Sequence, residues 1–143
     1  MSDPNCLFCK IAAREIPAEI LRESERVVAF RDINPVAPVH ILLIPKEHLE
    51  SLADVADHHG DVLADLFQAA AHLARTEGID RSGWRVIANN GPDAGQEVFH
   101  VHLHVVPRFP GDGFGLRRSM GRRQPEREAL DRTAEQIRAG FDA

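Results

Sequence analysis

The sequence has 143 residues, of which 43% are hydrophobic, and a formal net charge of −5, values typical of one small globular domain with a real core. The negative charge argues against nucleic acid as a partner, because sequence-independent binding depends on clustered Lys and Arg. No apolar run approaches the roughly 20 residues that cross a membrane, and the first residues are unlike a signal peptide. We therefore expect a cytoplasmic protein without a membrane partner, formed by a single domain over residues 1–143.

The N-terminal third predicts one short helix followed by three strands. Leu7, Phe8 and Ile11 lie at helical spacing, and Pro17 ends that pattern. Short apolar runs separated by turn residues, prolines among them, come next. The predicted ranges are a helix at Cys6 to Arg14 and strands at Ala18 to Arg22, Val27 to Asp32 and His40 to Ile44.

A long amphipathic helix is predicted from Asp57 to Glu77, stopped by Gly78. Two strands follow, Trp84 to Asn89 and Val98 to Val106, and a last helix starts at Pro125 and ends near Gly140. This order predicts an α+β fold in which five antiparallel strands carry helices on one side. The apolar residues of the long helix, at steps of three and four, are Val62, Leu63, Leu66, Phe67, Ala70, Leu73 and Ala74.

Three histidines alternate with aliphatic residues between Phe99 and Val106. A period of two predicts a half-buried strand with His100, His102 and His104 on one face. A rise of about 3.3 Å per residue sets neighbours about 6.5 Å apart and the outer pair about 13 Å apart. That spacing suits a linear substrate such as a phosphate chain better than a single metal ion. A lone histidine on a sheet face is more often structural, so it is the strict alternation that favours function.

Two separate motifs follow one another in this chain. One runs from Phe30 to His48 and contains Asp-Ile-Asn-Pro and Pro-Lys-Glu-His; the other runs from Asn89 to Arg108 and contains the three histidines. Together they resemble the signature of the histidine triad (HIT) nucleotide-binding family. The resemblance covers about residues 6–108, leaving 109–143 as a C-terminal loop and helix. It implies a HIT-like fold that dimerises into one continuous sheet, for which an uncovered strand edge is physically suited.

Two branches of the family share features with this chain. The loop from Gly91 to Gln96 resembles that of the dinucleoside polyphosphate hydrolases. The segment from Asp32 to Pro35 and the N-terminal cysteines resemble the bacterial nucleoside phosphoramidases, which is the branch that we favour.

The resemblance implies roles for four histidines. A neutral imidazole can attack phosphorus, and a neighbouring one can donate a hydrogen bond or a proton. His102 is the expected nucleophile, forming a nucleotidyl-histidine intermediate that water then hydrolyses. His104 would hydrogen-bond the phosphate or pass a proton, and His40 would complete the charge network, with His100 as the remaining member. Catalysis in this scheme needs no cofactor.

The resemblance also implies contacts to a purine nucleotide. Asp32 resembles the acid that accepts hydrogen bonds from the ribose hydroxyls, although an aspartate also commonly ends a strand or caps a turn. Asn89, Gln96 and the backbone amides around Gly95 would position phosphate oxygens. The residues that would line an apolar slot for the base, or alternatively form plain core, are Phe8, Ile11, Phe30 and Ile33.

Glu97, which precedes Val98 in the substrate-binding loop, departs from the family pattern. We count both residues among those that face the substrate. The phosphoramidate-cleaving branch has a small hydroxyl residue in place of Glu97, which can hydrogen-bond a leaving amine. A carboxylate beside a phosphate is repulsive unless it faces elsewhere or is protonated. The sequence therefore does not determine which leaving group the protein prefers.

Cys6 and Cys9 are the two cysteines of the sequence, and their spacing is compatible with a metal site, a redox pair or inert thiols. Bacterial relatives in the family pair such cysteines with the histidine of the Pro-Lys-x-His segment and with the first triad histidine, here His48 and His100. The resemblance thus implies a structural zinc ion held by Cys6, Cys9, His48 and His100. His100 would then be structural, and its backbone carbonyl would orient His102.

These features predict a homodimeric hydrolase or nucleotidyl transferase that cleaves purine nucleoside phosphoramidates or related α-phosphate esters. The alternatives are a dinucleoside polyphosphate hydrolase and a zinc-stabilised nucleotide-binding or interaction protein with little turnover. We interpret His58, His59 and His72 as ordinary surface or boundary residues. One local basic cluster, either a solvated loop or a grip on substrate phosphates, consists of Arg117, Arg118, Arg122 and Arg123.

Overall fold

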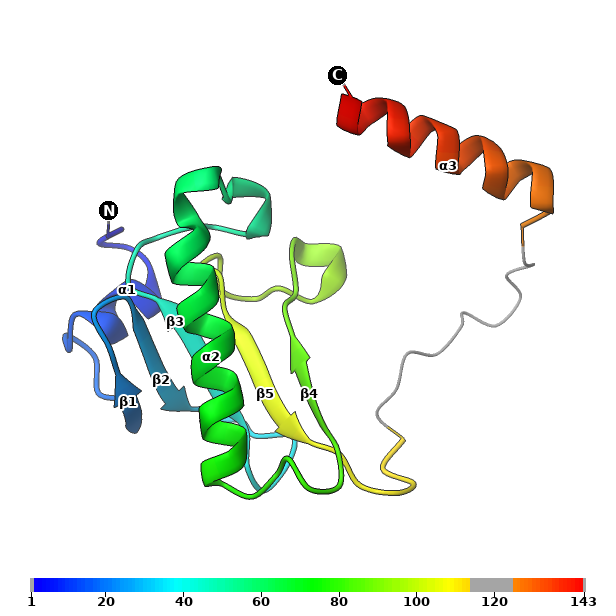
Figure 1. The fold of residues 1–143 in the computed structure, drawn as a ribbon. Helices are drawn as coiled ribbons and strands as arrows, with labels where there is room; N and C mark the ends of the chain where they lie inside the picture. Colours follow the sequence, from blue (N-terminus) through cyan, green and yellow to red (C-terminus); the bar gives the residue numbers. More distant parts are fainter. Residues whose placement is uncertain (1, 114–124, 143) are drawn as a thin grey trace. The chain divides into compact units, whose positions relative to one another are not determined.

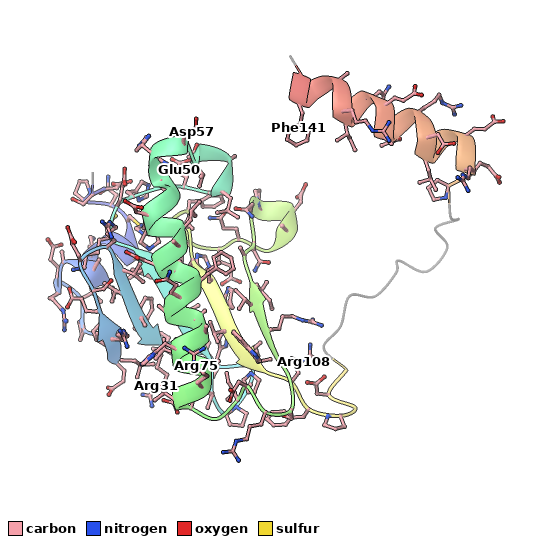
Figure 2. All side chains as sticks on the ribbon, in the orientation of Figure 1. Arg31, Glu50, Asp57, Arg75, Arg108 and Phe141 are labelled. Carbon is pink, nitrogen blue, oxygen red and sulfur yellow. The ribbon has the colours of Figure 1, made fainter. Side chains whose placement is uncertain are left out.

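The structure is a computed structural model that describes residues 2–113 and 125–142. Its contacts divide the chain into a unit that ends at Asp112 and a second that starts at Gly113. The second unit contains helix α3 (Arg127–Asp142), on which Phe141 is exposed (Figure 2). No helix in the described ranges is long and apolar enough to span a bilayer. The single domain stays a prediction, and the basic cluster lies outside the described residues, at Arg117, Arg118, Arg122 and Arg123.

A five-stranded antiparallel sheet forms the first unit, in the order β1-β2-β3-β5-β4 (Figure 1). This confirms the predicted α+β fold and its five strands. The last strand of the sequence lies between β3 and β4, so the histidine-bearing segment leads into the interior of the sheet. The strands are β1 (Ile20–Glu23), β2 (Val27–Arg31), β3 (Ile41–Pro45), β4 (Trp84–Ile87) and β5 (Leu103–Pro107).

Helices cover both faces of the sheet, so the prediction of helices on one side is wrong. Helix α2 (Gly60–Thr76) packs against the face that carries Ala29 and Leu43, and α1 (Leu7–Ala12) packs against the face that carries Phe30 and Leu42. The physical reason is visible in β2 and β3. Both are almost continuously apolar, and successive side chains point to opposite faces, so each face must be buried.

Helix α2 follows its prediction closely. A short 3-10 turn at Asp57–His59 precedes it, and Gly78 with φ of +72° follows its end, as expected of a residue that tolerates the left-handed conformation. Two side chains differ from expectation. Phe67 is 56% exposed, and His59 is buried, with its Nδ1 accepting the Ala56 N–H at 2.8 Å.

The predicted strand from Val98 to Val106 begins only at Leu103. Upstream of it, the Val101 N–H donates to the Leu49 carbonyl at 2.7 Å, and the His100 N–H donates to the Val98 carbonyl at 2.9 Å. These bonds turn the chain and tie it to a loop instead of to β3. His100 and His102 therefore precede the strand, and the prediction that one strand carries all three histidines is wrong.

Candidate active site

The site lies on the α1 face of the sheet, where residues from three strand ends meet. Leu42 in β3 is paired with His104 in β5, so both side chains leave on one face. His40 stands two residues before Leu42, and Asp32 stands just after β2, two residues beyond Phe30. Alternation along three neighbouring strands thus brings His40, Asp32 and His104 together.

His102 is held by a backbone acceptor and by two aromatic contacts. Its Nδ1 lies 2.7 Å from the His100 carbonyl oxygen. Because a carbonyl can only accept, Nδ1 carries the ring proton and Nε2 keeps a free lone pair. The Phe8 ring meets the imidazole edge to face at a centroid distance of 5.0 Å, and the His104 ring lies at the same distance. These contacts orient the ring, and the tautomer that they select leaves Nε2 as the nitrogen with the lone pair.

His40 and His104 form a second fixed pair. The Val36 N–H donates to His40 Nδ1 at 3.2 Å, which puts the proton of a neutral His40 on Nε2. That Nε2–H lies 2.8 Å from His104 Nδ1 and donates to it. The neutral His104 then carries its own proton on Nε2. Asp32 Oδ2 lies 3.4 Å from His40 Nε2.

Burial keeps this pair neutral. Burial lowers the pKa of His40, and the nearby Asp32 carboxylate opposes that shift in part. Burial also lowers the pKa of His104 to about 4, with repulsion from His102 and His40 adding to the effect and Asp32 opposing it. At neutral pH His104 therefore acts as a hydrogen-bond donor and not as a cation.

A cluster of four possible metal ligands lies behind His102. His100 Nδ1 is 3.4 Å from Cys6 Sγ, 3.5 Å from Cys9 Sγ and 3.3 Å from His48 Nδ1, and His48 Nδ1 is 3.3 Å from Cys9 Sγ. A tetrahedral zinc ion with ordinary bond lengths needs about 3.5 Å between S and N ligands and about 3.3 Å between two N ligands. The donor set and its spacing fit zinc.

The tautomer and the neutral state of His100 agree with metal binding, whereas burial of Cys9 favours its protonated thiol. His100 is fully buried and its Nε2 lies 2.7 Å from the Pro45 carbonyl, so Nε2 carries the proton and Nδ1 has the lone pair that faces the sulfurs. Burial lowers the pKa of His100 to about 4, against the hydrogen bond to Pro45, which raises it. Burial raises the pKa of the Cys9 thiol, while the Asp3 N–H that donates to its sulfur lowers it.

Gln96 is committed to the loop that carries it. Its Oε1 accepts the Gly91 N–H at 2.8 Å, and its Nε2 donates to the carbonyls of Glu50 at 2.7 Å and Val98 at 3.0 Å. The side chain is 4% exposed, so backbone groups take all its hydrogen-bonding directions except one lone pair.

In contrast, the half-buried Asn89 side-chain amide has no hydrogen-bond partner among the described residues and is free for a ligand. Gly95, with φ of +88°, makes the turn between Asn89 and Gln96.

Glu97 is exposed and lines a cavity of about 310 Å³ with two further carboxylates, Asp3 and Glu50. Cys6 and His48 also line that cavity, so Glu97 lies on the side of the cysteine cluster. Val98 is partly buried against the α1 core. Three carboxylates therefore line the cavity beside the loop that precedes the histidines.

Of the four residues expected to line a slot for the base, three lie in one buried cluster and the fourth is exposed. Phe8, Ile11 and Phe30 are buried in the core cluster between α1 and the sheet, with Phe8 and Phe30 packed edge to face at 5.5 Å. Ile33 is 86% exposed. Three of the four thus have a clear packing role, and Ile33 is free on the surface beside Asp32.

The contacts that the sequence could not predict come from the backbone. The Val36 N–H and the carbonyls of Pro45 and Glu50 orient side chains of the site. Such groups are present in every residue and therefore leave no signal in residue types.

Comparison with known proteins gives consistent matches. The family model described as HIT domain matches residues 13–111. The purine nucleoside phosphoramidase of Escherichia coli is 43% identical over 104 residues, which cover 73% of this chain and 87% of that protein. The 14 kDa zinc-binding protein of Zea mays is 43% identical over 108 residues, covering 74% and 84%. The crystal structure of a HIT family hydrolase from Legionella pneumophila superposes with a TM-score of 0.70 at 43% identity, covering 82% of this chain and 97% of that one.

Proposed function

Because the chain belongs to the HIT domain family, we propose that it hydrolyses purine nucleoside phosphoramidates or related α-phosphate esters through a nucleotidyl-histidine intermediate on His102. Hydrolase activity on a nucleotide-related substrate is the general function that its relatives support. The observation that carries the specific proposal is the 2.7 Å contact between His102 Nδ1 and the His100 carbonyl, which leaves Nε2 as a nucleophile on a fixed ring.

The chemistry follows from the ring tautomers. His102 Nε2 attacks the α-phosphorus, a new N–P bond forms, and the bond to the leaving nitrogen breaks as that nitrogen takes up a proton from solvent water and departs as an amine. Water then attacks the same phosphorus, the bond between His102 Nε2 and phosphorus breaks, and the proton of the attacking water returns to solvent, so the nucleoside monophosphate is released and His102 is restored. The His104 Nε2–H donates to a phosphate oxygen in both steps and stabilises its growing charge. His40 holds His104 in the tautomer that can do so.

Asp32 and Asn89 are the groups that we assign to substrate. Oδ1 of Asp32 accepts the Asn34 N–H at 2.8 Å and Oδ2 lies beside His40, yet 17% of the side chain is still exposed. The remaining lone pairs suit ribose hydroxyls. The Asn89 amide and the backbone amides near Gly95 would bind phosphate oxygens, and the Gln96 contacts to Gly91, Glu50 and Val98 would hold that loop in place.

Cys6, Cys9, His48 and His100 would hold a structural zinc ion. Bound zinc would supply a rigid crosslink between α1, the segment after β3 and the segment before β5, and it would leave no open position for chemistry because all four ligands are protein side chains. The chain's own contribution is to present the His100 carbonyl and the Phe8 ring to His102 from two of these three segments. A homodimer joined at a strand edge and a cytoplasmic location complete the proposal.

Incubation with adenosine 5′-phosphoramidate, followed by chromatography of the products, tests the function. We expect the amine and adenosine monophosphate in equal amounts, and a transient adduct of nucleotide mass on the intact protein. His102→Ala should abolish both, while His58→Ala, which changes an exposed histidine outside the site, should leave both unchanged. Turnover by His102→Ala would refute the assignment of His102 as the nucleophile. Absence of turnover by the unmodified protein would favour the alternative function, a nucleotide-binding protein with little turnover.

A further inference from the structure

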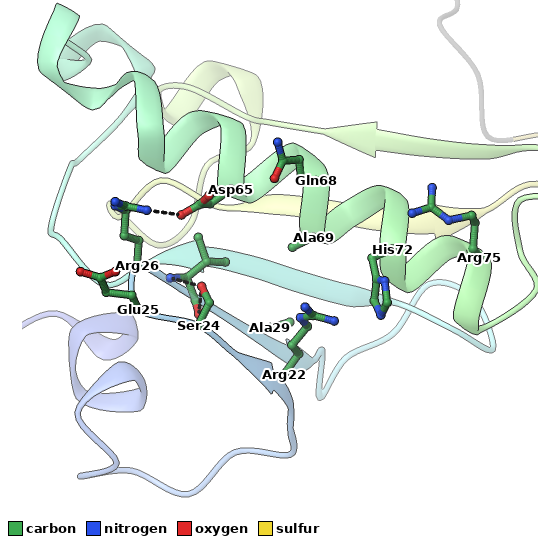
Figure 3. Close-up of a pocket in the computed structure, with 11 residues that line it drawn as sticks. Arg22, Ser24, Glu25, Arg26, Ala29, Asp65, Gln68, Ala69, His72 and Arg75 are labelled. Carbon is green, nitrogen blue, oxygen red and sulfur yellow. Dashed lines mark hydrogen bonds and ion pairs between the residues drawn. The ribbon is translucent and has the colours of Figure 1, made fainter.

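A hollow of about 440 Å³ lies on the α2 face of the sheet, between α2 and the first two strands (Figure 3). It exists because small side chains, Ala29 of β2 and Ala69 of α2, line it where the helix passes over the sheet. Arg22 of β1 is paired with Ala29 across the strands, so its side chain leaves on this same face. The histidine site lies on the opposite face of the sheet.

The charges in this hollow are separated along its length. At one end Arg26 is neutralised by Asp65, at 2.9 Å, with Glu25 nearby (Figure 3). At the other end lie Arg22, His72 and Arg75, and Figure 3 shows these three without a carboxylate between them. Neither Arg22 nor Arg75 has an ion-pair partner within the described ranges. An unbalanced basic end is notable in a protein whose formal net charge is −5.

We propose that Arg22, His72 and Arg75 form a binding site for a phosphate chain, of the length of pyrophosphate or longer, separate from the histidine site. Two guanidinium groups from different elements can each hold a phosphate group with two parallel hydrogen bonds. His72 lies one helical turn before Arg75 and adds a third donor on the same side of α2. The volume lies within the range of small-ligand pockets. The site does not depend on the function proposed for His102.

Titration of the full chain with inorganic pyrophosphate, measured by calorimetry, tests this site. Arg22→Ala combined with Arg75→Ala should weaken binding at least tenfold. The matched control combines Arg81→Ala with Arg132→Ala, two exposed arginines outside the hollow, and removes the same charge. The control should keep the affinity within twofold of the unmodified protein. Equal losses in both double variants would show a net-charge effect only and overturn the proposal.

Nuclear magnetic resonance of the unmodified protein gives a second readout that requires no variant. Addition of pyrophosphate should shift the side-chain Nε–H signals of Arg22 and Arg75 and the ring signals of His72, while those of Arg81 stay in place. Unshifted Arg22, His72 and Arg75 signals at millimolar pyrophosphate, or an unchanged affinity of the Arg22→Ala/Arg75→Ala variant, would also overturn the proposal.

Discussion

Acidification should destabilise the protein through His104, whose folded-state pKa of about 4 is far below its ordinary value. As the pH falls below about 6.5, the unfolded chain binds a proton at this ring before the folded chain does, so stability is lost with falling pH. The loss is complete only below about pH 4, where both states are protonated. A difference of about 2.5 pKa units corresponds to about 3 kcal/mol in total, of which about 2 kcal/mol is lost between pH 7.5 and pH 5.0.

Guanidinium chloride unfolding of the unmodified protein and of His104→Gln at pH 7.5 and pH 5.0 measures this effect. The unmodified protein should lose about 2 kcal/mol more than the variant between the two pH values, because glutamine keeps a hydrogen-bonding side chain but does not titrate. The His104 ring should also stay neutral in its magnetic resonance spectrum at pH 5.5. The same pH dependence in both proteins, or a His104 titration near pH 6.5, would refute the assignment of a neutral donor.

Three further changes probe other parts of the site. Cys9→Ser should reduce bound zinc to under about a tenth of an equivalent by elemental analysis, and a full equivalent in the variant would contradict the four-ligand site. Asp32→Ala should raise KM for a ribonucleoside phosphoramidate about tenfold but leave KM for the 2′,3′-dideoxy analogue, which has no ribose hydroxyl, nearly unchanged, as read from initial rates; equal effects on both substrates would refute the ribose contact. Gln96→Leu should lower the free energy of unfolding by about 2–3 kcal/mol in chemical denaturation, because three backbone groups lose their hydrogen-bond partner. A loss under about 0.5 kcal/mol would show that the Gln96 side chain does not hold the loop in place.

Local periodicity predicted most of the elements in this fold. The long helix was expected from Asp57 and is a 3-10 turn followed by α2, and the strand expected at Val27 to Asp32 is β2 with one residue fewer. Both patterns depend on residues that are neighbours in sequence. The faces of the sheet that carry helices were predicted wrongly. The apolar runs of β2 and β3 have to be buried on both faces, whereas the predicted arrangement placed helices on only one face.

The histidine segment shows where sequence reasoning fails. Its alternation resembles a strand from Val98 onward, yet the Val101 N–H is taken by Leu49, a residue 52 positions away in the chain. No local pattern contains that partner. The resemblance of two sequence motifs to a known family identified His40, His102 and the cysteine cluster as candidates. The carbonyl of Pro45 and the N–H of Val36, which fix the tautomers, are invisible at that level.

The pairing of Leu42 with His104 restricts how this protein can change during evolution. Leu103 and Val105, on either side of His104, are buried in the core beneath α2. A one-residue shift of β5 would place the His104 imidazole in the apolar core beneath α2 and an aliphatic side chain on the face of the histidine site. Insertions or deletions between His102 and the strand should therefore be eliminated by selection, whereas exchanges that preserve chain length can accumulate around them.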